Sequence, residues 1–261
     1  MIPKRDTDHK LALVTGATAG IGEAVARRLA SEGWDLVLTG RRFERLNRLT
    51  HELKEVCPHV AVLSLSFDVC SESDTFDALE GLNEDWQAVD LLVNNAGLSQ
   101  SLEPVHRQDP ADWDRMIDTN IKGLLRVSRV VAPWMRRRGK GHIINLGSIA
   151  GKEVYANGAV YCATKHAVEA ITRSMRLELN PDGIKVGLIA PGLVETEFSV
   201  VRFKGDRERA AAVYHGLEPL LAADIADAVW YMVSRPAHVH VADMLILPTA
   251  QASMGQITRR Q

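Results

Sequence analysis

Short apolar runs alternate with longer amphipathic segments along the whole chain. The apolar runs have the length and unbroken hydrophobicity of strands buried on both faces, and they occur at 11–14, 36–38, 60–65, 89–93, 142–146, 184–189 and 244–247. Between them, apolar residues recur with helical spacing at about 21–31, 42–56, 73–82, 110–138 and 157–180. The alternation predicts the α/β class: a doubly wound (Rossmann) sheet of seven parallel strands with helices on both faces.

One segment breaks this alternation. Residues 191–219 contain few strand signals, several charges and glycines at 192, 205 and 216. Long irregular segments in compact domains are usually lids or binding loops, so we expect a substrate lid here. Because no linker, repeat or low-complexity stretch divides the 261 residues, the sequence predicts a single domain over 1–261 that includes this lid.

Composition narrows the possible function classes. The chain holds 31 Lys and Arg against 33 Asp and Glu, a net charge of −2, which argues against nucleic-acid binding through a basic surface. No apolar run approaches the ~18 residues that cross a bilayer, and the polar residues 1–10 do not resemble a secretory signal. The three cysteines, Cys57, Cys70 and Cys162, lack metal-ligand spacing and are typical of a reducing compartment. We therefore expect a cytoplasmic protein without a metal site.

A glycine-rich turn follows the first predicted strand. It runs from Thr15 to Gly22, with glycines at 16, 20 and 22, and it leads directly into a predicted helix. Glycines permit a tight turn and let a pyrophosphate approach the backbone, and the free N–H groups of a helix N-terminus attract phosphate. The turn therefore predicts a dinucleotide site, although a glycine-rich turn without a ligand would show the same pattern. Its candidate cofactor-binding residues are Gly16, Thr18, Ala19, Gly20, Ile21 and Gly22.

The second strand ends in Thr39-Gly40-Arg41-Arg42, without a carboxylate. An enzyme that uses NAD usually has an acidic residue at this point for the ribose 2′-hydroxyl, whereas a guanidinium can bind the 2′-phosphate of NADP. Arg41 and Arg42 therefore favour NADP as the cofactor. The alternative is that both are solvated side chains at the start of a helix.

Three further residues indicate proton chemistry. Tyr161 and Lys165 are four residues apart in a helical segment, so both side chains lie on one face. An ammonium near a phenol should lower the pKa of the tyrosine, which would let Tyr161 exchange a proton with an alcohol or carbonyl oxygen. Ser148 lies just beyond the fifth strand, at the edge of the sheet where ligands bind, and its hydroxyl could bond to the same oxygen.

With these motifs, the chain resembles the short-chain dehydrogenase/reductase family over essentially its whole length. The glycine turn, Asn-Asn-Ala-Gly at 94–97 and the order Ser148, Tyr161, Lys165 carry the resemblance, and Asn120 matches the family's fourth catalytic residue. The resemblance implies hydride transfer between a nicotinamide and a carbon that bears a hydroxyl. It implies that Tyr161 is the acid/base, that Lys165 holds the nicotinamide ribose and lowers the tyrosine pKa, and that Ser148 positions the substrate oxygen. Asn120 would hold a water that links Lys165 to solvent.

The resemblance also implies the remaining cofactor contacts. Asp68 and Val69 would flank the adenine, residues 95–97 would lie against its ribose, and four residues after the sixth strand would line the nicotinamide side. By number, the last two groups are Asn95, Ala96, Gly97, Pro191, Gly192, Val194 and Thr196.

The substrate must be inferred from the lid and the tail. Segments 201–206, 235–240 and 247–251 resemble the branch of the family that oxidises 3-hydroxy acids, including serine and allo-threonine, with NADP. A 3-hydroxy acid needs a cation near the reacting carbon to fix its carboxylate. Arg202 is the candidate, so Ser148, Tyr161 and Arg202 would bind the substrate. Lys204 and Lys152 are alternatives, and Arg202 could also be a solvated loop residue.

Two other functions stay open at this point. The charged pair Lys152-Glu153 before Tyr161 indicates either a different small acidic substrate, such as a sulfonate-bearing aldehyde, or a pair that faces solvent. A reductase of another small carbonyl compound, such as sulfoacetaldehyde or a dicarbonyl, is therefore an alternative. A regulator that binds NADP without turnover would keep the fold, although such proteins usually lose the tyrosine or the lysine. Small and apolar residues on the two long helices, such as Ala163, Ala167 and Ile171, suit the subunit packing that the family uses. We therefore expect a homotetramer that binds a small-molecule substrate and neither nucleic acid nor membrane.

Overall fold

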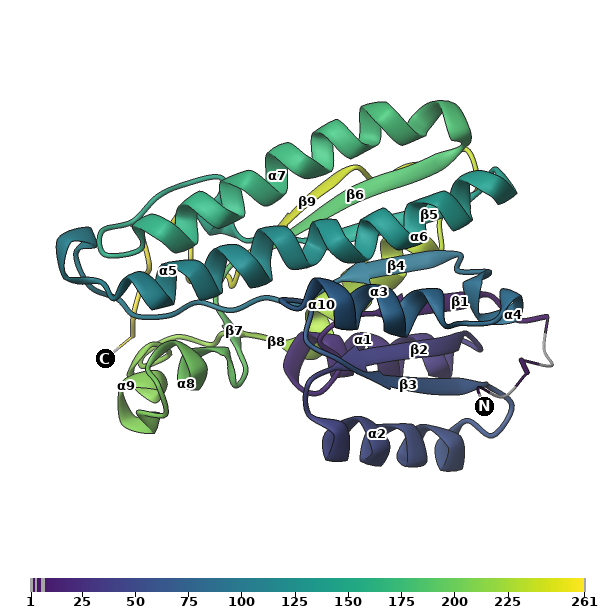
Figure 1. The fold of residues 1–261 in the computed structure, drawn as a ribbon. Helices are drawn as coiled ribbons and strands as arrows, with labels where there is room; N and C mark the ends of the chain where they lie inside the picture. The colour runs from purple at the N-terminus through teal and green to yellow at the C-terminus, as the bar shows by residue number, and fades with distance from the viewer. Residues whose placement is uncertain (1, 3, 6–7, 261) are drawn as a thin grey trace.

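Seven parallel strands form one sheet, in the spatial order β3-β2-β1-β4-β5-β6-β9, in the computed structural model, which describes residues 2, 4–5 and 8–260 (Figure 1). Every neighbouring pair in this sheet is parallel. The prediction of a doubly wound, seven-stranded sheet is confirmed, and each strand end falls within two residues of its predicted position. The strands are β1 (Leu11–Val14), β2 (Asp35–Gly40), β3 (Val62–Ser66), β4 (Leu91–Asn94), β5 (Gly141–Leu146), β6 (Ile184–Pro191) and β9 (Asp243–Ile246).

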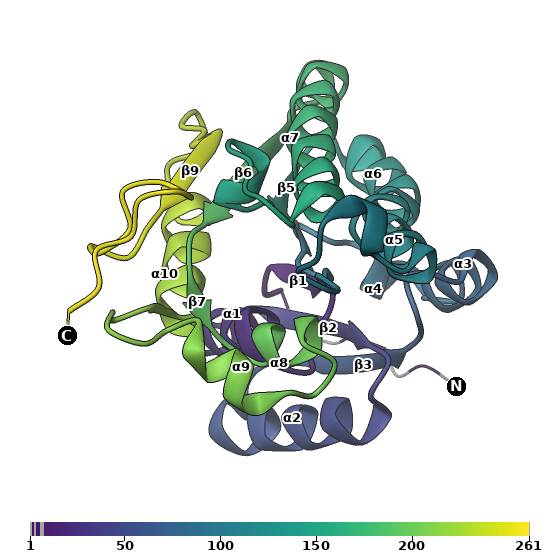
Figure 2. The same cartoon turned by 90° about the vertical axis from the view of Figure 1, so that its left-hand side faces the viewer.

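Helices cover both faces of the sheet (Figure 2). Ala12 and Val14 of β1 pack in the apolar core on one face, whereas Leu11 and Leu13 pack in the core on the other, and all four are completely buried. This burial on both faces explains why the strands are unbroken apolar runs. Within the described ranges, no helix combines the length and apolar character that crossing a bilayer requires. One face carries α1 (Gly20–Ser31), α2 (Phe43–Val56) and α10 (Ala222–Val233), and the other carries α3 (Glu72–Glu80), α4 (Glu84–Gln87), α6 (Leu124–Arg138) and α7 (Ala159–Leu179).

The single long helix predicted over 110–138 is continuous in the structure, but it is not α-helical throughout. A π-helical stretch, Asp118–Gly123, separates α5 (Pro110–Ile117) from α6. A π-helical turn holds more residues than an α-helical turn, and such insertions are frequent at functional sites. The spacing of apolar residues does not reveal this insertion, which contains the fully enclosed Asn120.

Residues 191–219 have more regular structure than the sequence indicates. β7 (Val194–Glu195) pairs in parallel with β8 (Leu220–Leu221). Two short helices, α8 (Phe198–Arg202) and α9 (Arg207–Ala212), lie between these strands in the sequence. Figure 1 shows both helices at one end of the main sheet, below α5. This segment therefore lies beside the edge of the sheet at which the site residues are predicted.

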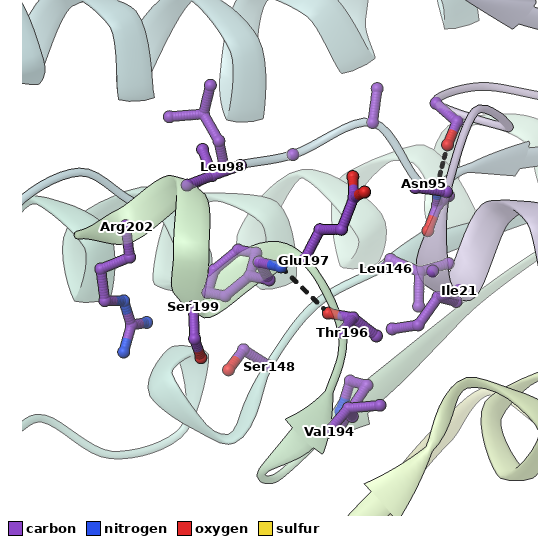
Figure 3. Close-up of a pocket in the computed structure, with 18 of the residues that line it drawn as sticks. Ile21, Asn95, Leu98, Leu146, Ser148, Val194, Thr196, Glu197, Ser199 and Arg202 are labelled. Atoms are coloured by element: carbon purple, nitrogen blue, oxygen red, sulfur yellow. Dashed lines mark hydrogen bonds between the residues drawn. The ribbon is translucent and has the colours of Figure 1, made fainter. Parts of the chain in front are cut away.

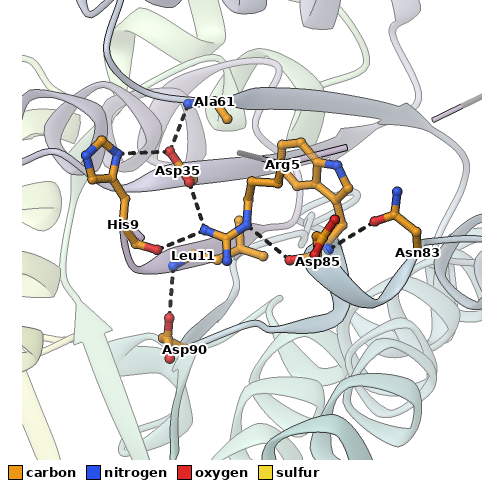
Figure 4. A network of polar contacts seen from close by, with 9 residues as sticks. Arg5, His9, Leu11, Asp35, Ala61, Asn83, Asp85 and Asp90 are labelled. Atoms are coloured by element: carbon orange, nitrogen blue, oxygen red, sulfur yellow. Dashed lines mark hydrogen bonds and ion pairs between the residues drawn. The ribbon is translucent and has the colours of Figure 1, made fainter. Parts of the chain in front are cut away.

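A buried carboxylate ties the start of the chain to the sheet (Figure 4). Asp35, the first residue of β2, is fully buried and accepts hydrogen bonds from the Ala61 N–H and the Arg5 guanidinium, each at 2.8 Å. Arg5 also donates to the carbonyl oxygens of His9 at 2.8 Å and Asp85 at 3.0 Å. The segment before β1 is thus held against β2 and α4 by one guanidinium.

Replacing Arg5 with glutamine should lower the free energy of unfolding by about 3 kcal/mol, because the ion pair offsets much of the cost of burying the Asp35 carboxylate. Urea unfolding followed by circular dichroism measures the loss. As a matched control, Arg137→Gln in the exposed last turn of α6 should change stability by less than about 0.5 kcal/mol. Equal effects of the two substitutions would contradict a structural role for the Arg5–Asp35 pair.

Candidate active site

A cavity of about 370 Å³ lies where the ends of β1, β4, β5 and β6 meet the segment 191–219. The strand order reverses between β1 and β4, and the carboxyl edge beside such a reversal is where doubly wound sheets bind ligands. Two residues predicted for the site, Gly22 and Asn120, are not part of the cavity lining. The others all line it: Gly16, Thr18, Ala19, Gly20, Ile21, Arg41, Arg42, Asp68, Val69, Asn95, Ala96, Gly97, Ser148, Tyr161, Lys165, Pro191, Gly192, Val194, Thr196 and Arg202.

Crowding explains the glycines of the turn after β1. Gly16 and Gly20 have positive φ angles of 67° and 55°, a conformation that side chains rarely adopt. At Gly22 a Cβ atom would lie 2.4 Å from the amide nitrogen of Asn95 and 2.5 Å from the Gly16 carbonyl oxygen. The Asn95 amide is fixed there because it donates to the Thr15 carbonyl oxygen at 2.8 Å. The turn therefore packs against the loop after β4 and faces the cavity with backbone, which fits a bound pyrophosphate.

Arg41 and Arg42 line the cavity beside this turn, with 53% and 44% of their side chains exposed. The Arg41 guanidinium lies 3.4 Å from the Asp68 carboxylate. Arg42 donates to the Thr18 hydroxyl from Nε at 3.1 Å and from Nη2 at 2.8 Å. Its Nη1 donates to the Glu197 carboxylate at 2.8 Å. Two guanidinium groups with accessible N–H groups at this place fit a 2′-phosphate.

Buried hydrogen bonds set α7 against the sheet. Asn145 in β5 accepts from the Asn94 amide at 2.9 Å and donates to the Thr172 hydroxyl of α7 at 2.9 Å. None of these three residues is more than 4% exposed. Because buried polar groups need partners, the bonds fix α7 relative to β4 and β5. The side chains at the beginning of α7 are thereby directed toward the ends of these strands.

Tyr161 and Ser148 meet at the inner wall of the cavity (Figure 3 shows Ser148 near the lid residues). Tyr161 comes from α7 and is 7% exposed, and Ser148 follows β5. Burial raises the pKa of the Tyr161 hydroxyl above its usual value, while the Arg202 charge and a hydrogen bond with Ser148 act to lower this pKa. The pair can therefore present two neighbouring hydroxyl groups to a single substrate oxygen.

Lys165 lies one turn beyond Tyr161 and is also buried. Its Nζ donates to the Leu146 carbonyl oxygen at 2.8 Å, and burial lowers the pKa of this ammonium to about 8. Burial raises the Tyr161 pKa more than the Arg202 charge and the Ser148 hydrogen bond lower it, so a lowering of this pKa by Lys165 stays a prediction.

Asn120 connects the π-helical stretch to two neighbouring elements. Its carbonyl oxygen accepts from the Leu98 N–H at 2.8 Å, and its amide donates to the Leu98 carbonyl oxygen at 2.8 Å and the Thr164 hydroxyl at 3.0 Å. A Cβ atom at Gly97 would lie 3.3 Å from the Asn120 oxygen and 3.6 Å from Lys165 Nζ. The missing side chain at Gly97 therefore leaves free space next to both polar groups, while the water relay stays a prediction.

Arg202, the last residue of α8, brings a cation to the reacting end of the cavity. Its guanidinium carbon lies 5.3 Å from the centre of the Tyr161 ring and 5.0 Å from that of Phe198. The buried Nε atom has no hydrogen-bond partner among the described residues. The two alternatives lie elsewhere: Lys204 pairs with Asp112 at 2.9 Å, Lys152 pairs with Asp243 at 2.7 Å, and neither lines the cavity.

Several cavity residues were not predicted. Tyr155 lies in the loop before α7, where burial raises its pKa and no periodic pattern marks it. Gln251 lies in the tail, and its side-chain Oε1 accepts a hydrogen bond from the Leu193 N–H at 2.9 Å. Phe198 and Glu197 belong to the segment that the sequence suggests is irregular. Among the described residues, no group of three or more His, Cys, Asp or Glu is arranged to hold a metal ion.

Known proteins match this chain along nearly all its length. The family model described as short chain dehydrogenase matches residues 10–206. The NADP-dependent 3-hydroxy acid dehydrogenase YdfG of Salmonella typhi is 44% identical over 251 residues, 96% of this chain and 99% of that protein. Sulfoacetaldehyde reductase 2 of Chromohalobacter salexigens is 45% identical over 244 residues, 93% of this chain and 95% of that protein. The closed form of serine dehydrogenase complexed with NADP+ has a TM-score of 0.89 and 42% identity, with 96% and 100% of the two chains covered.

The depressed pKa of Lys165 should appear in the pH dependence of stability. Above pH about 8 the buried ammonium loses its proton, whereas an unfolded lysine keeps it to about pH 10.4. The unfolded state then binds more protons, so the free energy of unfolding should rise by about 2 kcal/mol between about pH 7.5 and 10. In Lys165→Met this rise should disappear, as measured by urea unfolding at several pH values.

The exposed Lys54 supplies the control for that measurement. Lys54→Met should keep the wild-type pH dependence, because this side chain is in solvent. If Lys165→Met followed the same curve as Lys54→Met, burial would not depress the Lys165 pKa.

Proposed function

The chain belongs to the short-chain dehydrogenase family, and from this premise we propose that it is an NADP-dependent oxidoreductase of short 3-hydroxy acids, of the serine, allo-threonine and 3-hydroxypropionate type. The observation that carries the proposal is the position of Arg202. Its guanidinium lies 5.3 Å from the ring of Tyr161, so one cation and one buried phenol face the same small space. A 3-hydroxy acid has an acid group and a reacting hydroxyl at a matching short separation.

Tyr161, Ser148 and Lys165 handle the proton. In the oxidation, the Tyr161 oxygen takes the proton of the substrate hydroxyl, and the Ser148 hydroxyl holds the same substrate oxygen in place. In the reduction, protonated Tyr161 gives the proton back, and burial favours this protonated form. Lys165 supplies an ammonium beside the nicotinamide ribose, and Asn120 holds the water that connects it to solvent. The presence of both Tyr161 and Lys165 favours an enzyme over a regulator that binds NADP without turnover.

The first turn and the two arginines hold the cofactor. Bound NADP supplies the hydride acceptor or donor at its nicotinamide. The backbone of Gly16–Ile21 would receive the pyrophosphate, Arg41 and Arg42 would bind the 2′-phosphate, and Asp68 and Val69 would flank the adenine. Residues 95–97 would lie against the adenine ribose, and the nicotinamide side would be lined by Pro191, Gly192, Val194 and Thr196. The proposal is supported by the positive φ angles of the turn and by the half-exposed guanidinium groups next to it.

Segment 191–219 is, in this proposal, the substrate lid. It contributes Arg202 and Phe198 to the wall, and it excludes water from Tyr161 when it covers the cavity. A small sulfonate such as sulfoacetaldehyde is the second candidate substrate. The similarity to sulfoacetaldehyde reductase 2 favours it, and Arg202 binds a sulfonate through the same two N–H groups as a carboxylate.

We also infer a homotetramer in a reducing compartment, the cytoplasm. All three cysteines are free, as a reducing compartment allows. A mostly apolar hollow lies between α7 and the end of α5 with the π-helical stretch after it, on the face where the family packs its subunits. Its lining residues are Ile117, Ile121, Ala159, Val160, Ala163 and Thr164.

Replacing Arg202 with methionine should selectively impair turnover of acids. With NADP, we expect kcat/KM for 3-hydroxypropionate to fall about 10- to 100-fold relative to that for the neutral 1,3-propanediol, because a charged hydrogen bond contributes ~1.5–3 kcal/mol. The absorbance of reduced nicotinamide follows the reaction. Serine, allo-threonine and 3-hydroxyisobutyrate are tested in the same way with NADP, and sulfoacetaldehyde is tested with NADPH. Comparing their kcat/KM values identifies the preferred substrate.

Lys152→Met is the matched control, because Lys152 is a nearby cation outside the cavity lining. It should leave the ratio between acid and neutral substrate unchanged. If Arg202→Met lowered kcat/KM equally for the acid and the neutral substrate, Arg202 would not bind the acid group. Rapid turnover of neutral carbonyls alone, without turnover of any acid, would overturn the proposed substrate class.

Size-exclusion chromatography with light scattering tests the assembly. We expect a mass four times that of one chain, and Ala163→Asp, which places a charge in the apolar hollow, should shift the protein to a smaller species. A single-chain mass for the wild type would contradict the homotetramer.

A further inference from the structure

Glu197, just before α8, makes contacts that the proposed chemistry does not use. Its two carboxylate oxygens accept hydrogen bonds from Arg45 Nη1 at 2.8 and 2.9 Å, and one of them also accepts from Arg42 Nη1 at 2.8 Å. These hydrogen bonds lower the pKa of Glu197, so the carboxylate is ionised at neutral pH. Because Arg42 and Arg45 stand at the beginning of α2, Glu197 joins the lid to that helix.

Arg42 shares its guanidinium between two parts of the molecule. Nε and Nη2 donate to Thr18 in the first turn, while Nη1 donates to Glu197 of the lid. A guanidinium has five N–H groups, so these three bonds to described residues leave two N–H groups for a phosphate. Arg42, Thr18 and Glu197 all line the cavity, whereas Arg45 does not. The planar Arg42 guanidinium therefore contacts the first turn and the lid, and it faces the cavity proposed for the cofactor.

The middle of the lid is held separately. The Lys204 ammonium lies 2.9 Å from the Asp112 carboxylate of α5, and the Ser101 N–H donates to the Arg202 carbonyl oxygen at 3.1 Å. Neither contact involves α2 or its arginines. The lid is thus held by two separate sets of contacts. The set at Glu197 includes Arg42, a candidate for binding the 2′-phosphate.

We propose that Glu197 is a positioning residue that couples the lid to recognition of the 2′-phosphate at Arg42. The inference rests on the proposed function, because it requires that phosphate to bind Arg42. A phosphate that fixes Arg42 also fixes the N–H group that holds Glu197, so ordering the lid then costs less conformational entropy. A cofactor without the phosphate lacks this effect. The lid therefore discriminates between NADP and NAD without touching the phosphate.

Two small probes and limited proteolysis test the coupling in the full chain. Adenosine 2′,5′-bisphosphate carries the phosphate in question, and adenosine 5′-monophosphate lacks it. Trypsin reports on the lid at Arg207 and Arg209, which are exposed in α9. With each probe saturating, as established by calorimetry, we expect the bisphosphate to slow lid cleavage about fivefold more than the monophosphate, the lower range of measured couplings. In Glu197→Gln, which keeps the shape and removes the charge, this difference should vanish.

Asp112→Asn provides the matched control, because it loosens the lid at its other set of contacts and leaves every trypsin site intact. Its lid should be cut faster without a probe, yet the difference between the two probes should remain. If Glu197→Gln kept the difference, or if Asp112→Asn lost it equally, the lid would respond to general loosening and the coupling through Glu197 would be refuted. A failure of the bisphosphate to bind the wild type more tightly than the monophosphate would instead overturn NADP recognition itself.

Discussion

The hydrogen bonds among three buried polar side chains determine where the reactive helix lies. Asn94, Asn145 and Thr172 form a continuous chain from β4 through β5 to α7, and none has water to replace a lost partner. The apolar contacts of α7 are numerous but non-directional, so they would tolerate a shift or rotation of this helix. The amide and hydroxyl groups would not, because each displaced group would be buried without a partner. Tyr161 reaches Ser148 as a consequence of that constraint.

Much of this arrangement follows from local patterns in the sequence. The inner strands β1, β2, β4, β5 and β6 are buried on both faces, and the apolar runs of all seven strands could be located within two residues. The glycines of the first turn follow from its backbone geometry. Ser148, Tyr161 and Lys165 were found because the ends of strands and the spacing of helical residues are regular. The family resemblance added Asn120 and the cofactor contacts after 191, which no local pattern marks.

Other features depend on contacts between distant segments and could not be predicted. Asn120 faces Leu98 and Thr164 because a π-helical stretch redirects it, and hydrophobic spacing has no signal for one additional residue in a turn. The Tyr161 pKa is raised because the side chain is buried. The spacing of four residues between Tyr161 and Lys165 does not reveal this burial. The sequence does not distinguish three cations near the site: Arg202, Lys152 and Lys204. In the structure, each lysine pairs with a carboxylate outside the cavity, whereas Arg202 lines the cavity.

In the proposed function, Arg202 links substrate recognition to the proton-transfer group. As a cation facing the Tyr161 ring, it opposes the rise in tyrosine pKa that burial causes. A substrate carboxylate that binds this guanidinium adds a negative charge there and weakens its effect on the phenol. Binding an acid thus favours the protonated tyrosine, which is the form needed to reduce a carbonyl. Oxidation of the same acid therefore depends more strongly on other cations near Tyr161, and Lys165 is the one that lies on the same face of α7.

The lid places two opposite charges at the two ends of one short helix. Glu197 precedes α8 and faces the arginines of α2, whereas Arg202 ends α8 and faces Tyr161. α8 has only five residues, so its two ends lie about 7.5 Å apart along the helix axis. In the proposed function, the carboxylate beside the cofactor arginines and the guanidinium for the substrate acid are therefore carried by neighbouring positions of one short segment.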